Sequence, residues 1–147
     1  MIEIIKGHDY SSYFWFLPVV DDLIDADDEF SIEEEDVRHF LMPCISKYDK
    51  HFEWYLTDNF FKYGVVKEMI AELEKVITLL KTDSDNTYLD DYKEAFKDGF
   101  SYKNDDGPKV LDAHYAEIID FYNRFIKSLK EMMEKYPYAG KISIMGP

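Results

Sequence analysis

The chain has 147 residues, a formal net charge of −14 at pH 7 and an aromatic content of 17%. This length fits one domain, residues 1–147, that can bury a core without a metal or disulfide staple, and the aromatic content excludes a disordered acidic tail. The charge disfavours nucleic acid and anionic membranes as partners and favours basic surfaces. The same charge could also serve only to keep an aromatic-rich protein soluble.

Cysteine content and targeting signals indicate the compartment. Cys44 is the single cysteine, so no intrachain disulfide can form, and its apolar and acidic surroundings do not favour a thiolate. We therefore expect Cys44 to be a buried core residue. The apolar segment 13–20 is too short to span a membrane and lacks the features of a signal peptide. The sequence thus predicts a cytoplasmic protein.

The two ends of the chain have strand character. Residues 1–5 (MIEII) and 141–145 (KISIM) are short and rich in β-branched side chains. They could pair as a short β ribbon that joins the termini. Between residues 10 and 24 the chain is apolar, its second half has helical spacing, and Pro18 would break or begin a helix there.

Helix signals follow the acidic N-terminal part. Ser31 and Glu34 have the spacing of a capping box, which predicts a helix that begins near Ile32. Pro43 would end that helix or begin the next one, because proline suits a first helical position.

The strongest helical periodicity lies in the second half of the chain. One apolar stripe covers 65–81, where Glu68, Glu72 and Lys75 fall off the stripe and suit a solvated side. A shorter helix is predicted over 87–98 with Gly99 at its end, and a long one follows Pro108 and stops before Pro137. The predicted fold class is therefore mainly α, a helical bundle with a long C-terminal helix.

The acidic segment at 19–37, VVDDLIDADDEFSIEEEDV, contains ten carboxylates and no basic residue. It directly follows the aromatic run YFWF at 13–16. An exposed segment of this composition would attract a basic surface, and Trp15 would supply an aromatic anchor, with Trp54 as a second choice. The predicted partner-binding residues are Trp15, Asp21, Asp22, Asp25, Asp27, Asp28, Glu29, Glu33, Glu34, Glu35 and Asp36.

Catalytic and metal motifs give little support for an enzyme. Asp36 and His39 are three residues apart, as are His114 and Glu117, but one pair begins with the acid and the other with the histidine. Di-metal bundles use a uniform Glu-x-x-His order, so this pattern does not match. No glycine-rich phosphate loop or nucleophile elbow occurs. We expect no catalytic residues, metal or cofactor, and a carboxylate metal-dependent enzyme of helical-bundle type remains the alternative, beside a regulatory adaptor.

With its acidic segment, small size and lack of catalytic motifs, the chain resembles the small immunity proteins of bacterial toxin systems, including contact-dependent growth inhibition. The resemblance covers the general character of the whole chain and no residue motif. It implies a protein that binds a cognate basic toxin, often a nuclease, and covers its active surface. In this interpretation the carboxylates steer association and the aromatic side chains hold the complex.

Overall fold

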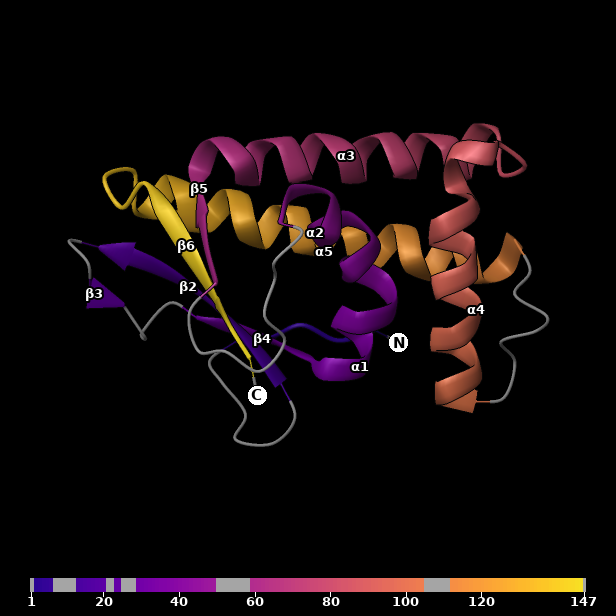
Figure 1. Cartoon of the computed structure of the whole chain (residues 1–147), viewed down its shortest axis with the longest axis horizontal. Helices are drawn as coiled ribbons and strands as arrows, with labels where there is room; N and C mark the ends of the chain where they lie inside the picture. Colours follow the sequence, from indigo (N-terminus) through magenta and orange to yellow (C-terminus); the bar gives the residue numbers. More distant parts are fainter. Residues whose placement is uncertain are drawn as a thin grey trace.

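The computed structural model describes residues 2–6, 13–20, 23–24, 29–49, 59–104 and 112–146. These residues form an antiparallel sheet and a set of helices, so the chain is a mixed α/β protein (Figure 1). The predicted mainly α bundle is therefore wrong. The error lies in the N-terminal part, where residues predicted as helix form strands.

The sheet holds six strands within the described residues. They are β1 (Ile5–Lys6), β2 (Tyr13–Val20), β3 (Leu23–Ile24), β4 (Phe30–Glu33), β5 (Asn59–Lys62) and β6 (Lys141–Met145). The order is β1-β4-β2-β6-β5, and β3 pairs with the end of β2. The strand predicted at 141–145 is confirmed as β6. The predicted terminal ribbon is wrong, because β6 lies between β2 and β5 whereas β1 pairs with β4.

Because β2 is buried on both faces, its sequence does not show the pattern that predicts a strand. Phe14 and Phe16 belong to the main hydrophobic core, and Leu17 and Val19 are also buried but lie on the opposite face. A strand buried on both sides is a continuous apolar run without alternation, which periodicity cannot distinguish from a helix segment.

Pro18 fits into β2 without the loss of a ladder hydrogen bond. Tyr63 donates its N–H to the carbonyl of Gly140 (2.8 Å), so the backbone groups of Gly140 point toward the β5 side. In an antiparallel pair every second residue points the same way, and the backbone groups of Ile142 therefore also point toward β5. Pro18 lies opposite Ile142, and its nitrogen therefore points away from β6. On that side the pairing with β4 ends before Pro18 and the pairing with β3 begins after it.

A continuous helical segment follows β4. It consists of α1 (Glu34–Asp36), the π-helical segment η2 (Val37–Leu41) and α2 (Met42–Tyr48). The predicted start near Ile32 is wrong, because Ser31 and Ile32 belong to β4 and no side chain caps the helix. Pro43 lies in the first turn of α2, as the sequence predicts.

The later helices match the predictions more closely. They are α3 (Tyr63–Thr82), the 3₁₀ segment η3 (Thr87–Leu89), α4 (Asp90–Asn104) and α5 (Asp112–Lys135). The helix predicted over 65–81 is confirmed as α3, and the described part of the long C-terminal helix is confirmed as α5. The predicted end at Gly99 is wrong, because α4 continues through this residue.

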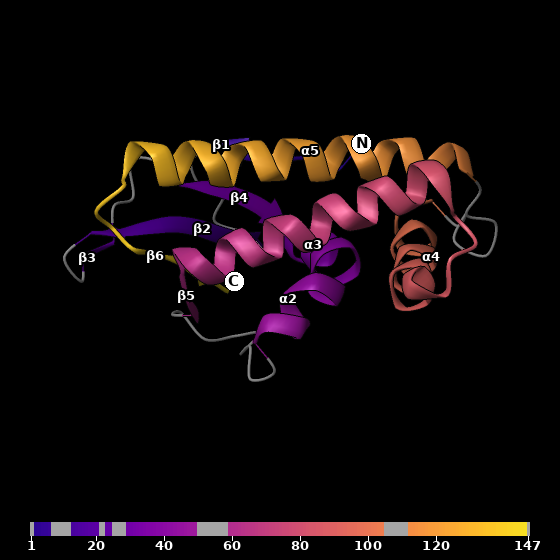
Figure 2. The ribbon, with the colours of Figure 1, turned by 90° about the horizontal axis from the view of Figure 1, so that it is seen from above.

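Helices α3 and α5 lie side by side over one face of the sheet, and α4 stands across the end of the molecule (Figures 1 and 2). Aromatic rings join the layers: Phe16 stacks on Phe30 with centroids 4.8 Å apart, and Phe125 of α5 meets Phe16 edge-on at 5.4 Å. Among the helices of the described ranges, none has the length and apolar character needed to cross a membrane.

Candidate functional site

The structure places the described part of the predicted acidic segment at different depths. Glu29 is 6% exposed and Asp36 is 3% exposed, so both carboxylates are buried rather than presented to solvent. Glu33, Glu34 and Glu35 are half-buried. The other predicted carboxylates lie outside the described residues: Asp21, Asp22, Asp25, Asp27 and Asp28. Their role in partner binding stays a prediction.

Of the two predicted tryptophan anchors, the structure describes Trp15. Trp15 is half-buried in β2, opposite Ser31 of β4 and Met145 of β6. Since its neighbours Phe14 and Phe16 point into the core, Trp15 points to the other face of the sheet. Trp54 lies outside the described residues. The assignment of Trp15 as an anchor therefore also stays a prediction.

Glu34 and Glu35 are held by the next turn of their own helical segment. Arg38 lies 3.3 Å from Glu34 and 3.7 Å from Glu35, and His39 Nε2 lies 3.1 Å from Glu35 Oε2. Arg38 also lines a shallow depression together with Asp91 of α4. The acidic pair in α1 is thus connected to the surface of α4.

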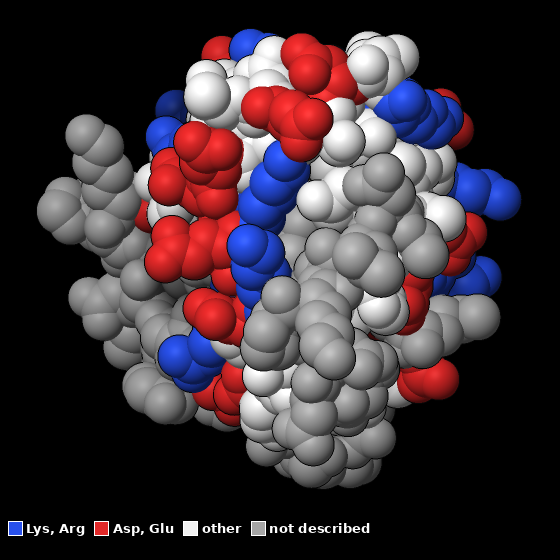
Figure 3. Space-filling model, turned by 90° about the vertical axis from the view of Figure 1, so that its right-hand side faces the viewer, with Lys and Arg blue, Asp and Glu red and all other residues white. Residues whose placement is uncertain are grey.

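The exposed face of α4 and the turn before it carry a concentration of carboxylates that is not part of the predicted site. The buried residues of α4, including Tyr92 and Phe96, face the core, and the acids lie on the opposite side of the helix. We call this surface the α4 acidic face, defined as the exposed residues Asp83, Asp85, Asp90, Asp91, Glu94 and Asp98. In Figure 3, which looks onto this end of the molecule, carboxylates gather in a band beside a line of basic side chains.

Exposed tyrosines flank the α4 acidic face. Tyr102 is 61% exposed and follows Asp98 by one helical turn, and Tyr88 is 37% exposed just before α4. The rings of Tyr102 and His39 are 6.4 Å apart, which connects this surface to η2. A sequence signal for this surface exists: the apolar positions of 87–98 have helical spacing, so the acids between them must share the outer face.

A buried polar cluster joins α2, α3 and the start of α4. Glu72 accepts hydrogen bonds from Tyr92 (3.0 Å), from Lys47 (3.1 Å) and from Tyr88. Glu72 is only 7% exposed, so its predicted position on a solvated side of α3 is wrong. The reason is tertiary: Lys47 of α2, Tyr88 of η3 and Tyr92 of α4 surround the carboxylate and supply its three donors.

The charges in this cluster are stable near neutral pH. Burial alone would raise the pKa of Glu72, but its hydrogen bonds from the two tyrosines and Lys47 outweigh burial and lower the pKa. Burial raises the pKa of Tyr92 above its usual value. Because these shifts fix an ionised carboxylate and a neutral phenol, neither group can exchange a proton readily at pH 7. The arrangement supports the junction of helices rather than proton transfer.

Cys44 is buried beside this cluster, as the sequence predicts, and is 1% exposed. Its Sγ lies 3.7 Å from the carbonyl oxygen of Met69. Burial raises the pKa of the Cys44 thiol to about 12. The group is therefore a neutral thiol at physiological pH and has little nucleophilic character.

The two histidines considered as metal ligands have different partners in the structure. His39 contacts Glu35, whereas His114 packs on the ring of Phe100 with centroids 4.5 Å apart. Within the part of the chain that the structure describes, no three His, Cys, Asp or Glu side chains converge in a geometry that could hold a metal ion. Comparison of the chain with protein-family models, with curated proteins and with solved structures gave no match.

Proposed function

We propose that this chain is a binding protein that neutralises a cognate basic protein, a toxin domain of the nuclease type, by covering its active surface. The observation that carries the proposal is the α4 acidic face, with six exposed carboxylates and the flanking tyrosines Tyr88 and Tyr102. The general resemblance to immunity proteins supports the same function.

The chemistry of the two surfaces is complementary. A nuclease must expose lysine and arginine side chains to bind phosphates. Clustered carboxylates would accelerate encounter with such a surface, to association rates on the order of 10⁸–10⁹ M⁻¹s⁻¹ at low salt. Four of the six carboxylates are carried by α4, whose other side is packed into the core, so the backbone that presents them is held in place before binding.

Aromatic side chains would supply the dehydrated centre that charge alone does not give. Tyrosine is enriched among the residues that dominate binding energy, because its ring buries apolar area and its hydroxyl can still form hydrogen bonds. Tyr102 is the most exposed aromatic residue of α4. The proposal retains Trp15 and the segment 21–36 as a further contact region, and Glu34 and Glu35 adjoin α4 through Arg38.

The proposal is tested with a matched pair of charge variants. The first, D85N/E94Q/D98N, neutralises half of the α4 acidic face, and the control, E68Q/E74Q/E134Q, neutralises three exposed carboxylates of α3 and α5. Partner candidates are the neighbouring gene product and nucleases captured from the source cell. We expect the first variant to associate at least about tenfold more slowly at low salt, because steering depends on local charge. The control should keep the original rate.

Two further measurements complete this test. The unmodified protein should suppress the nuclease activity of the partner, and Tyr102→Ala should mainly accelerate dissociation, with a loss of about 2 kcal/mol of binding if Tyr102 is an anchor. Equal association rates for the two charge variants would show that the α4 acidic face does not steer binding. A partner that is bound but keeps its full activity would contradict neutralisation.

A further inference from the structure

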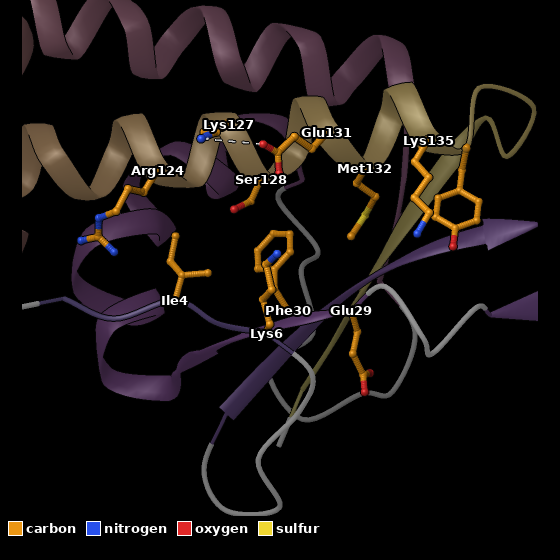
Figure 4. Close-up of a pocket in the computed structure, with 11 residues that line it drawn as sticks. Ile4, Lys6, Glu29, Phe30, Arg124, Lys127, Ser128, Glu131, Met132 and Lys135 are labelled. Atoms are coloured by element: carbon orange, nitrogen blue, oxygen red, sulfur yellow. Dashed lines mark ion pairs between the residues drawn. The ribbon is translucent and has the colours of Figure 1, made fainter.

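A cleft of about 570 Å³ lies between α5 and the β1–β4 edge of the sheet (Figure 4). Its volume is within the range of small-molecule sites, about 300–1,000 Å³. It shares no residue with the α4 acidic face. Substitutions in one of the two surfaces therefore leave the side chains of the other unchanged.

The cleft is basic although the protein is strongly acidic. Four cationic side chains line it, namely Lys6 of β1 and Arg124, Lys127 and Lys135 of α5. Two carboxylates also belong to the lining, but the side chain of Glu29 points away from α5 in Figure 4. A concentration of positive charge in a chain of net charge −14 indicates a local preference for an anion.

Glu131, the second carboxylate of the lining, neutralises little of this charge. Its Oε1 lies 3.9 Å from Lys127 Nζ, and the two side chains are 59% and 77% exposed. Exposed pairs of this kind contribute only about 0–1 kcal/mol, so Lys127 can exchange Glu131 for another anion at small cost.

Arg124 is held in place before any ligand arrives. Its Nε lies 2.8 Å from Asp120, and its Nη2 donates to the carbonyl oxygen of Ile2 at 2.7 Å. A guanidinium has five N–H donors, and these two bonds use only two of them. Arg124 therefore combines a fixed position at the N-terminal edge of the sheet with remaining donor capacity.

Apolar side chains lie between the basic ones. Ile4, Phe30 and Met132 line the cleft, and in Figure 4 they occupy the space between Arg124 at one end and Lys135 at the other. The ring of Phe30 is held by its stacking on Phe16. A fully hydrated inorganic anion would gain nothing from these three side chains, whereas an organic anion could cover them.

We propose that this cleft binds a small amphipathic organic anion, with its acidic group near Lys6, Arg124 and Lys127 and its apolar body over Ile4, Phe30 and Met132. The ligand class is a sulfonate, phosphate ester or carboxylate on a compact hydrocarbon or aromatic body. This inference goes beyond the neutralisation of a basic protein and does not depend on it.

The test uses anilinonaphthalene sulfonate as the amphipathic anion, phenylnaphthylamine as its neutral counterpart and inorganic sulfate as an anion without an apolar body. Binding is measured by calorimetry and fluorescence on the full chain. We expect one saturable sulfonate site per chain. K6Q/K127Q should weaken the affinity for the sulfonate about tenfold, equivalent to ~1.4 kcal/mol. The control K81Q/K97Q makes the same charge change on exposed residues of α3 and α4 and should stay within about twofold, because neither lysine lines the cleft.

Each alternative outcome is distinguishable. Equal affinity for the neutral counterpart, or equal weakening in both lysine variants, would overturn the proposal because the basic side chains would then have no local role. Complete competition by sulfate at similar concentration would show a simple anion site and would also overturn it. Circular dichroism and thermal unfolding of K6Q/K127Q, with transitions close to those of the unmodified protein, confirm that lost binding reflects the cleft and not the fold.

Discussion

Glu72 shows how a single buried carboxylate can be stabilised by its surroundings. Removal of a carboxylate from water is costly unless it accepts strong hydrogen bonds, and here Lys47 and two tyrosines supply them. The ammonium of Lys47 also lies 4.4 Å from the centre of the Tyr88 ring. The charge is therefore compensated on several sides, and the cluster links α2, α3 and α4.

Glu72→Gln should lower the free energy of unfolding by about 1.5–3 kcal/mol at pH 7, the range for hydrogen bonds to a charged group. Because the pKa of Glu72 is lowered in the folded state, its contribution is complete above the unfolded pKa of about 4.3 and decreases as the pH falls through the folded value. Chemical denaturation from pH 3 to pH 8 measures both effects.

Glu68→Gln is the control for this prediction, because Glu68 is on the same helix but exposed. Its effect should stay within about 0.5 kcal/mol, as for other exposed substitutions. A stability difference between the unmodified protein and Glu72→Gln that does not shrink at acidic pH would show that the charge of Glu72 is not the source of its contribution.

Among the elements, η2 and α4 approach each other closely at Gly99, where a side chain would not fit without a shift of its neighbours. A Cβ atom on Gly99 would lie 2.7 Å from the Cβ of His39 and 2.8 Å from the Cζ of Phe40. Phe40 is fully buried and its ring packs on Phe100 at 5.3 Å, so it has little room to move. Gly99 is required by this packing, although glycine usually weakens a helix.

Gly99→Ala should destabilise the protein by about 1–2 kcal/mol, because overpacking costs ~1–3 kcal/mol and exceeds the gain in helix propensity of up to ~1 kcal/mol. Gly64→Ala in α3 is the matched control, since an added Cβ there meets no atom within 4 Å. That control should be neutral or stabilising by up to ~1 kcal/mol. Thermal unfolding of both variants measures the difference, and equal stabilisation of the two would disprove the close contact.

For the whole molecule, β6 is the strand that completes the sheet. It comes from the C-terminal end of the chain and lies between β2 and β5, and Ile142 and Ile144 are at most 1% exposed. The sheet therefore requires contacts between residues more than 100 positions apart, such as Phe16 with Ile144. Stability of the N-terminal strands depends on the last strand.

Amide hydrogen exchange should reveal this dependence. Amides of β2 and β6 that are hydrogen-bonded within the sheet should exchange only through global unfolding. Exchange in β6 requires that both neighbouring strands, β2 and β5, first separate from it. Amides of β1, a two-residue edge strand, should exchange by smaller local openings and at least about tenfold faster. Mass spectrometry of peptic fragments measures both regions. Exchange of β6 at the rate of β1 would show that β6 detaches independently of the rest of the sheet.

The sequence by itself determined the features that depend on local pattern. The apolar stripes of α3 and α5 repeat with the helical period over many turns, and this pattern is unambiguous because only a helix brings those residues to one face. The segment KISIM was recognisable as a strand, and Cys44 as a core residue, from residue type and near neighbours.

Only the tertiary structure decided the features that depend on distant residues. The strand β2 is buried on both faces, so its sequence lacks the alternation that would identify it, and its partners come from residues 30–33 and 141–145. Density of acids likewise does not determine exposure: Glu29, Asp36 and Glu72 are buried, whereas six exposed carboxylates form the α4 acidic face. Burial of a side chain depends on what packs against it, and those neighbours are set by long-range contacts.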